Sequence, residues 1–141
     1  MAIYIVDASV VIEYIVAGPF TPNAHALFTQ ATSNDRFIVP EFCLLECTNV
    51  LWKRVRFDGM PIARAQALLR HLKKLPLTRV PAKAALSAAL TIGVTHQLAI
   101  YDSAYVALAS RSNYPLISID QPQIRAATAE GVTLIPVTHF R

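Results

Sequence analysis

The feature that most constrains the fold is a set of short, largely apolar runs that alternate with longer stretches of helical periodicity. We expect strands at IYIV (3–6), RFIV (36–39) and LISI (116–119), a brief one at 77–80, and a last one at VTLIPV (132–137). Apolar strands without polar alternation are buried on both faces, as in parallel sheets that helices cover. The pattern therefore predicts an α/β fold around a mostly parallel sheet.

Helices are expected between these strands. Apolar residues recur at helical spacing after Glu41 and again before Leu75, Pro81 stands at a helix start, and Gly131 marks a helix end. The expected helices cover residues 9–16, 41–57, 62–75, 81–92, 102–111 and 121–130, with a loop at 17–23 and a turn at 58–61.

The size and composition indicate a globular protein with a substantial core. The 141 residues fall in the single-domain range, so we expect one domain over 1–141. Hydrophobic residues make up 54% of the chain and charged residues 16%, which excludes a disordered chain. No apolar run approaches the roughly 20 residues of a membrane span, and no basic segment precedes the apolar start. We therefore expect a cytoplasmic protein without a membrane association.

Four acidic residues lie at strand ends or in apolar stretches, where a carboxylate is unusual unless it has a partner or a function. Asp7 directly follows the first strand, and Asp120 directly follows the strand at 116–119. Glu46 interrupts an apolar helical turn, and Asp102 begins a helix among mostly apolar neighbours. Because parallel strands end at the same edge, where ligands bind in such sheets, Asp7 and Asp120 should emerge together. Taken singly, each Asp could instead cap a helix, and Glu46 could lie on a polar helix face.

The four acids together favour a divalent-metal centre. Gathered carboxylates raise one another's pKa, and a hard cation offsets that repulsion. Mg²⁺ and Mn²⁺ take oxygen ligands, activate water and stabilise charge on a phosphodiester during cleavage. No glycine-rich nucleotide motif and no Ser-His-Asp or Cys-His arrangement offers another mechanism, and Cys43 and Cys47 are interpreted as buried apolar residues. We therefore predict an acidic metal site that can hydrolyse a phosphodiester.

The charge distribution agrees with an anionic partner. The net charge is +4, and nine of the 13 Lys and Arg residues fall between 53 and 83. At about 100° per residue, Asn49 and Lys53 return close to the face of Glu46, which makes them candidate substrate contacts. Lys53 could equally extend along an apolar surface as an ordinary exposed lysine. For Trp52 a core position is favoured over stacking on a base.

Four segments in order carry a resemblance to a known family. VDASV near the start, PEFCLLECTNVLWK, YDSAYVALA and LISID resemble the PIN domain, and among its members the VapC-type toxins of bacterial toxin–antitoxin modules. The similarity covers essentially the whole chain. The segment after Asp120 departs from the family, which often has a basic residue and a leucine there, whereas this chain has Gln121, Pro122 and Gln123.

The resemblance implies a three-layer α/β/α fold and a Mg²⁺- or Mn²⁺-dependent endoribonuclease. It implies that Asp7 and Asp102 are direct metal ligands, that Glu46 and Asp120 complete the site, and that Ser9 belongs to the pattern. Ser118 keeps the hydroxyl that the family has two residues before its last Asp. A cognate antitoxin protein and a homodimer are also implied.

Two rival functions remain open from the sequence. One is a PIN-like binding or scaffold domain without nuclease activity. The other is a phosphatase or phosphotransferase with Asp7 as nucleophile, although enzymes of the haloacid-dehalogenase type have a second Asp where this chain has Ser9.

Overall fold

Four parallel strands form the centre of the protein. A computed structural model describes residues 1–141, in which β1 (Ile3–Val6), β2 (Arg36–Pro40), β3 (Leu77–Val80) and β4 (Leu116–Ile117) form one sheet. The strand order is β3-β2-β1-β4, and every pairing is parallel. The strands predicted at 3–6, 36–39 and 77–80 are confirmed. Because β1 and β4 are neighbours, the segments that follow them leave the sheet side by side.

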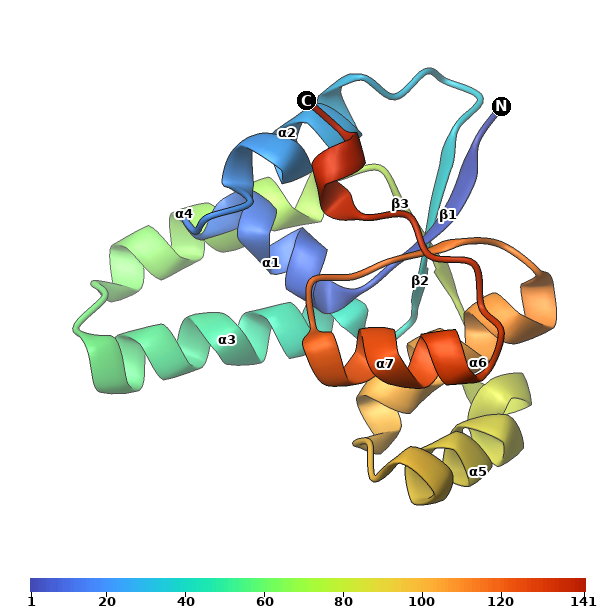
Figure 1. The fold of residues 1–141 in the computed structure, drawn as a ribbon. Helices are drawn as coiled ribbons and strands as arrows, with labels where there is room; N and C mark the ends of the chain where they lie inside the picture. The colour runs from blue at the N-terminus through green and yellow to red at the C-terminus, as the bar shows by residue number, and fades with distance from the viewer.

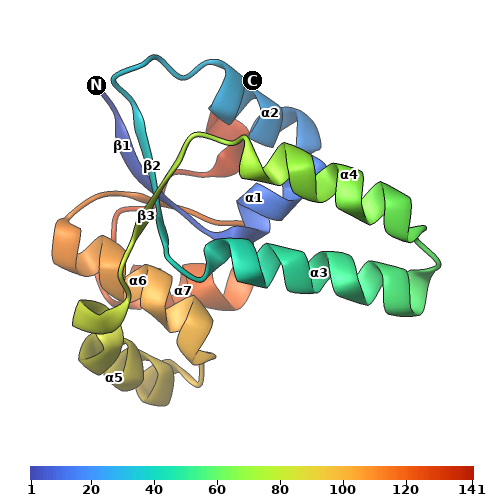
Figure 2. The same cartoon turned by 180° about the vertical axis from the view of Figure 1, so that it is seen from behind.

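Helices cover both faces of the sheet, which confirms the three-layer α/β/α prediction (Figures 1 and 2). α6 packs directly on β1, β2 and β4, and both α5 and α7 pack against α6. The opposite face is covered by α1, which packs against α2, α3 and α4. The bounds are α1 (Ala8–Ile15), α2 (Thr21–Thr29), α3 (Cys43–Asp58), α4 (Ile62–Lys73), α5 (Leu86–His96), α6 (Ile100–Ser112) and α7 (Gln121–Ala129), with 3-10 turns η1 (Lys83–Ala85) and η2 (Val137–His139).

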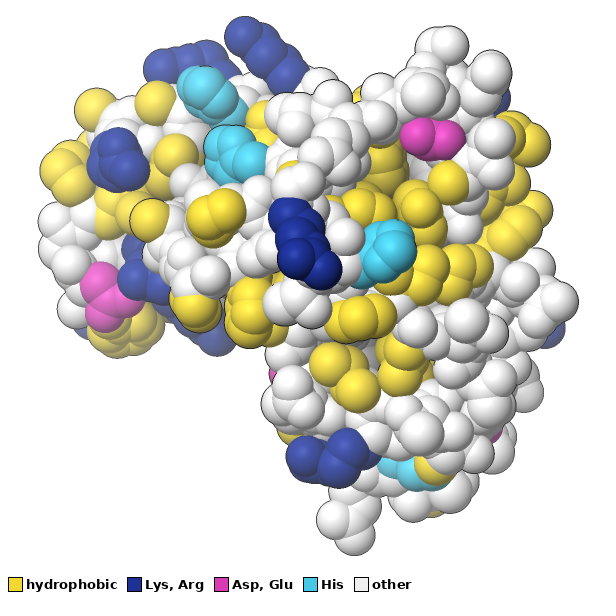
Figure 3. Space-filling model, turned by 45° about the horizontal axis from the view of Figure 1, so that its top comes forward, with side chains coloured by type: hydrophobic (Ala, Val, Ile, Leu, Met, Phe, Trp, Pro, Cys, Tyr) yellow, Lys and Arg dark blue, Asp and Glu magenta, His cyan; other side chains and the backbone are white.

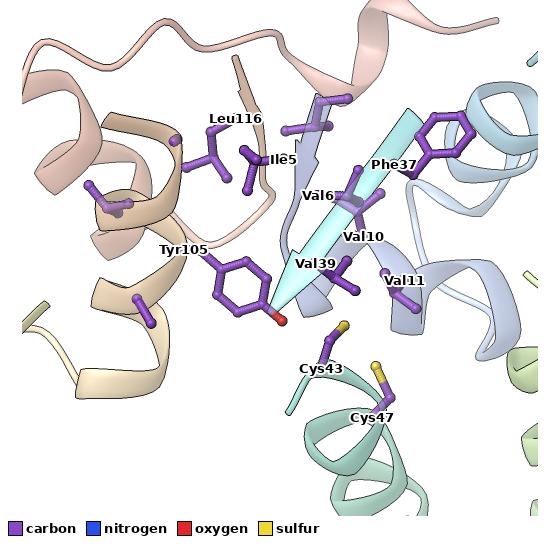
Figure 4. Close-up of a cluster of buried hydrophobic side chains, with 14 of the residues drawn as sticks. Ile5, Val6, Val10, Val11, Phe37, Val39, Cys43, Cys47, Tyr105 and Leu116 are labelled. Atoms are coloured by element: carbon purple, nitrogen blue, oxygen red, sulfur yellow. The ribbon is translucent and has the colours of Figure 1, made fainter. Parts of the chain in front are cut away.

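The core lies on both sides of β1 and β2. Figure 4 shows Tyr105 of α6 on one side of the strands and Val10, Val11, Cys43 and Cys47 on the other. Both cysteines are fully buried and free, as predicted. The hydroxyl of Tyr105 reaches past the end of β2 toward α3. The Tyr105 hydroxyl therefore lies close to residues of α3.

The segment predicted as a fifth strand at 132–137 is not one. It makes a single parallel bridge, between Leu134 and Leu116, and then enters η2. Pro136 explains the interruption, because proline has no backbone N–H with which to continue a ladder. β4 is also shorter than predicted: the N–H groups of Ile119 and Asp120 donate to the serine hydroxyls of Ser9 and Ser118 instead of to a neighbouring strand.

The helix α2 is absent from the sequence prediction, and the loop expected at 17–23 ends early where α2 begins at Thr21. Its start is held by tertiary contacts. Glu13 on α1 accepts a hydrogen bond from the backbone N–H of Phe20 at 2.6 Å, and the Thr21 hydroxyl donates to the Glu13 carbonyl at 2.9 Å. Pro22 in the first turn is a local signal of a helix start, but these contacts from α1 leave no signal in the sequence around α2.

One face of α5 is apolar and exposed. Leu86, Leu90 and Val94 follow one another at four-residue spacing and are 53%, 60% and 72% exposed. No single helix of the chain is both long and apolar enough to cross a membrane; only the stretch Lys83–His96 together with α6, at a bend of 117°, meets that length and composition.

Candidate functional site

A pocket of about 700 Å³ lies at the carboxyl edge of the sheet, and all four predicted acids line it. The acids come from four different elements: Asp7 follows β1, Glu46 lies on α3, Asp102 on α6, and Asp120 precedes α7. Ser9, Asn49 and Lys53 line the same pocket. The structure therefore brings together residues that are up to 113 positions apart in the sequence.

Asp7 is the most buried of the four acids, with 3% of its surface exposed. It caps α1, because its Oδ2 accepts a hydrogen bond from the Ser9 N–H at 3.0 Å. Asp7 is therefore both a helix cap and a residue of the pocket. Its Oδ1 accepts from the side-chain amide of Gln123 at 2.9 Å. Burial raises the pKa of Asp7, and these hydrogen bonds oppose that rise only in part.

Asp120 is held by its own short network at the end of β4. Its Oδ2 accepts from the Gln123 N–H at 3.0 Å, which caps α7. Its own N–H donates to the hydroxyl of Ser118 at 3.0 Å, and the hydroxyl of Ser9 accepts from the neighbouring Ile119 N–H at 3.1 Å. The two predicted serines thus fix the backbone that presents Asp120 and tie it to α1.

The carboxyl group of Glu46 is held in place by a single hydrogen bond, from a residue of another helix. The hydroxyl of Tyr105 donates to Glu46 Oε1 at 2.8 Å. Burial, followed by repulsion from Asp7 and Asp102, raises the pKa of Glu46 to about 7, although the tyrosine hydrogen bond lowers it. A carboxyl group with such a pKa can exchange a proton at neutral pH.

Asp102 lies in the first turn of α6, which begins at Ile100, so it is not a helix cap. No hydrogen bond to its side-chain oxygens holds it in the structure. Burial and the charges of Asp7 and Asp120 raise the pKa of Asp102 to about 6. The backbone carbonyl of the same residue accepts from Gln123 Nε2 at 3.1 Å, which connects α6 to α7.

The acids bring carboxylate oxygens into an open pocket, half of whose lining residues are hydrophobic. No three Asp, Glu, His or Cys side chains converge closely enough to enclose an ion by themselves. Burial, and after it the repulsion between neighbouring carboxylates, raises the pKa of Asp7, Glu46 and Asp102, and a cation would favour their ionised forms. Such a set suits a hard cation that keeps several of its waters, as Mg²⁺ does.

Residues 4–129 match the family described as PIN domain, which is most of the chain. The chain belongs to the PIN domain family. PIN domains are generally nucleases, and the convergence of acids from four elements agrees with that general chemistry. No curated protein sequence matches the chain significantly.

Solved structures share the same fold. PAE2754 from Pyrobaculum aerophilum superposes with a TM-score of 0.71 at 20% identity, over 99% of this chain and 94% of that one. VapBC2 from Rickettsia felis, solved bound to a promoter DNA fragment, gives 0.66 at 14% identity over 95% and 98%. FitAcB from Neisseria gonorrhoeae gives 0.65 at 15% identity over 98% and 99%. At these identities the likeness establishes the PIN fold.

Sequence reasoning misses Tyr101, Tyr105 and Gln123, which all belong to this PIN domain's site. The sequence shows Tyr105 only as part of an apolar helix, and Gln123 only as a departure from the family pattern. The prediction of a core position for Trp52 is wrong, because this residue is 55% exposed and lines the pocket. Tyr101, 61% exposed, lines the pocket as well. Contacts between elements that are distant in the chain decide all of these positions.

Proposed function

We propose that this PIN domain is a Mg²⁺- or Mn²⁺-dependent endoribonuclease of the VapC type, acting as the toxin of a type II toxin–antitoxin module. The observation that carries the proposal is the convergence of Asp7, Glu46, Asp102 and Asp120 on one pocket, with the pKa of three of them raised. A chain gains nothing in stability from gathering like charges, so the cluster is best explained by a cationic ligand.

Asp7 and Asp102 would hold the ion directly, and Glu46 and Asp120 would act through waters or a second ion. Such an ion supplies Lewis acidity toward water and phosphodiester oxygens. The side chains of the protein orient the groups that bind the ion and transfer protons. Tyr105 fixes Oε1 of Glu46, and Oε2, which has no hydrogen bond, accepts the proton of the attacking water. Ser9 orients the Asp7 carboxylate through its backbone N–H.

The pocket wall supports an RNA substrate with unpaired bases. Trp52 and Tyr101 expose aromatic rings in the same pocket as the acids. Exposed aromatic side chains stack on unpaired bases, each stack contributing about 1–3 kcal/mol. Lys53 and Asn49, both exposed and in the lining, would contact phosphate and base or sugar. We therefore propose that single-stranded RNA enters between these rings.

Protein partners complete the proposal. VapBC2 and FitAcB, which share this fold, support a cognate antitoxin for this chain. The exposed apolar face of α5, formed by Leu86, Leu90 and Val94, is the surface we assign to a homodimer. The side of the molecule that Figure 3 brings forward shows several Lys and Arg side chains and few acidic ones.

The proposal is tested by incubating a mixed RNA pool with the purified protein, with Mg²⁺ or Mn²⁺ and with chelator. We expect metal-dependent fragments, a loss of more than about 100-fold in Asp7→Asn, and no loss in Asp58→Asn, an exposed acid paired only with Arg54. Trp52→Ala should raise KM for RNA while leaving kcat nearly unchanged, because stacking binds substrate and transition state alike. Metal-independent cleavage would contradict the proposed metal dependence, and no cleavage by the folded wild type would contradict the proposal and favour a binding domain.

A further inference from the structure

We propose that Gln123 is a positioning residue of the acidic site, whose side-chain amide sets the Asp7 carboxylate and the start of α6 in the arrangement that receives the cation. The inference rests on the proposed metal-dependent function and deepens it. Gln123 belongs to the segment that departs from the family pattern, so nothing in the resemblance assigns it a role.

Gln123 contacts three of the four acids. Its Nε2 donates to Asp7 Oδ1 at 2.9 Å and to the Asp102 backbone carbonyl at 3.1 Å, and its backbone N–H donates to Asp120 Oδ2 at 3.0 Å. The side chain is completely buried. One residue in the first turn of α7 therefore connects the end of β1, the start of α6 and the end of the β4 segment.

The chemistry of its partners fixes which way the amide lies. A carboxylate oxygen and a backbone carbonyl are both acceptors, so the NH₂ group must face them and both of its protons are used. This leaves Oε1 buried without a partner. A buried oxygen without a hydrogen bond is unfavourable, and Met or Leu would fill the same space without one. Packing alone therefore does not account for a glutamine here.

A neutral donor has a specific advantage beside a metal ligand. An Arg or Lys at this position would neutralise Asp7 and compete with the cation for it. The amide orients the carboxylate while leaving its charge in place. With one hydrogen bond on each oxygen, from Gln123 and Ser9, both Asp7 oxygens keep lone pairs for a ligand. Groups that orient a ligand in this way typically change metal affinity by about 10–100-fold.

The test compares Gln123→Met, which keeps length and apolar volume, with Gln121→Met, an exposed glutamine on the same helix. Mn²⁺ binding is measured by calorimetry, and folding by circular dichroism. We expect the dissociation constant to rise about 10–100-fold in Gln123→Met and to stay unchanged in Gln121→Met. Equal Mn²⁺ affinity in the folded Gln123→Met variant and in the wild type would overturn the inference.

A second readout uses the wild type alone and holds even where the Met variant fails to fold. The Gln123 side-chain amide resonances are followed by NMR during titration with diamagnetic Mg²⁺. We expect protons slow to exchange in the metal-free protein and a change in resonance position that saturates with metal; unchanged resonances would overturn the inference. A wild type that binds neither ion overturns the proposed function and the metal-related role together, whereas a wild type that binds normally beside an unaffected Gln123→Met overturns only the latter.

Discussion

The two halves of the acidic pocket are held in different ways. In the strand-end half, Asp7 and Asp120 accept hydrogen bonds from Ser9 and Gln123, and Ser118 fixes the adjoining backbone. In the helix half, Glu46 on α3 has a single hydrogen bond, from Tyr105, and the side chain of Asp102 on α6 has none. The number of groups that orient each carboxylate therefore differs sharply across one cavity.

The difference shows that one site can contain both firmly oriented carboxylates and carboxylates whose pKa is raised without being opposed by several hydrogen bonds. Hydrogen bonds to a carboxylate favour its charged form and fix its plane, as they do at Asp7. Burial raises the pKa of Asp7 even so, but on the helix half, where one hydrogen bond or none opposes it, burial and neighbouring charges raise the pKa of Glu46 to about 7 and of Asp102 to about 6. We infer that the strand ends provide a fixed ligand, while the helices provide carboxylates whose charge state responds to a cation.

Among changes to the groups that orient the acids, the largest effect is expected from Ser9→Ala, which removes a contact of the strand-end half. The Ile119 N–H would lose its acceptor, and Asp7 would lose the nearby Ser9 hydroxyl that lowers its pKa, while the hydrogen bond from the Ser9 N–H would remain. We expect cleavage to fall about 10–100-fold and the free energy of unfolding to fall by about 1–3 kcal/mol. Rate assays and denaturant unfolding measure the two. The exposed Ser87→Ala is the matched control; equal losses in both variants would remove the distinction between the halves.

A smaller effect is expected from Tyr105→Phe, in the helix half. The Tyr105 hydrogen bond favours ionised Glu46, so without it the pKa of Glu46 rises above about 7. Activity that needs the ionised carboxylate then moves to higher pH, and a rise of about one in this pKa lowers the rate near neutral pH by up to about tenfold. A pH–rate profile measures this. Tyr4→Phe, whose ring stacks on Phe37 away from the pocket, should leave the profile unchanged; an unmoved profile in Tyr105→Phe would contradict the assignment.

The smallest effect is expected from Ser118→Ala. Only the Asp120 N–H loses its acceptor, and Asp120 is partly exposed, so water can replace the hydroxyl. We expect a loss of about 1 kcal/mol or less in the free energy of unfolding and cleavage within about threefold of the wild type. A loss in the rate assay as large as that of Ser9→Ala would show that Asp120 is as tightly positioned as Asp7.

The sequence predicts the strand-end half of the site well, because the signal is local. Asp7 directly follows β1 and Asp120 comes three residues after the end of β4, so both lie at the same edge because β1 and β4 are parallel neighbours. Glu46 and Asp102 are indicated by a different local signal, a carboxylate within an apolar stretch. The fold class follows from the same alternation of apolar runs and helices.

What could not be predicted depends on contacts between elements distant in the chain. Gln123 meets Asp7 only because α7 packs against α6, and Tyr105 meets Glu46 only because its ring crosses the end of β2. The cap that starts α2 comes from Glu13 on another helix. Trp52 follows an apolar period along α3, but no element covers that side of the helix.

The central claim is that the gathered carboxylates form one cation site, and thermal unfolding tests it most directly. The folded-state pKa values of Asp102 and Glu46 lie above their ordinary values of 3.8 and 4.5, so the metal-free fold is favoured while these groups are protonated. That contribution is complete below the ordinary values and is lost as the pH rises through about 6 and 7. A cation should restore the lost stability.

The measurement is the Tm of the wild type and of the double variant Glu46→Gln, Asp102→Asn, with and without Mn²⁺, between about pH 5 and pH 8. We predict that the metal-free wild type loses Tm relative to the double variant as the pH rises. Mn²⁺ should then raise the wild-type Tm most at the alkaline end and leave the double variant nearly unchanged. A Tm difference between the two proteins that is independent of pH, or an equal response of both to Mn²⁺, would contradict the account.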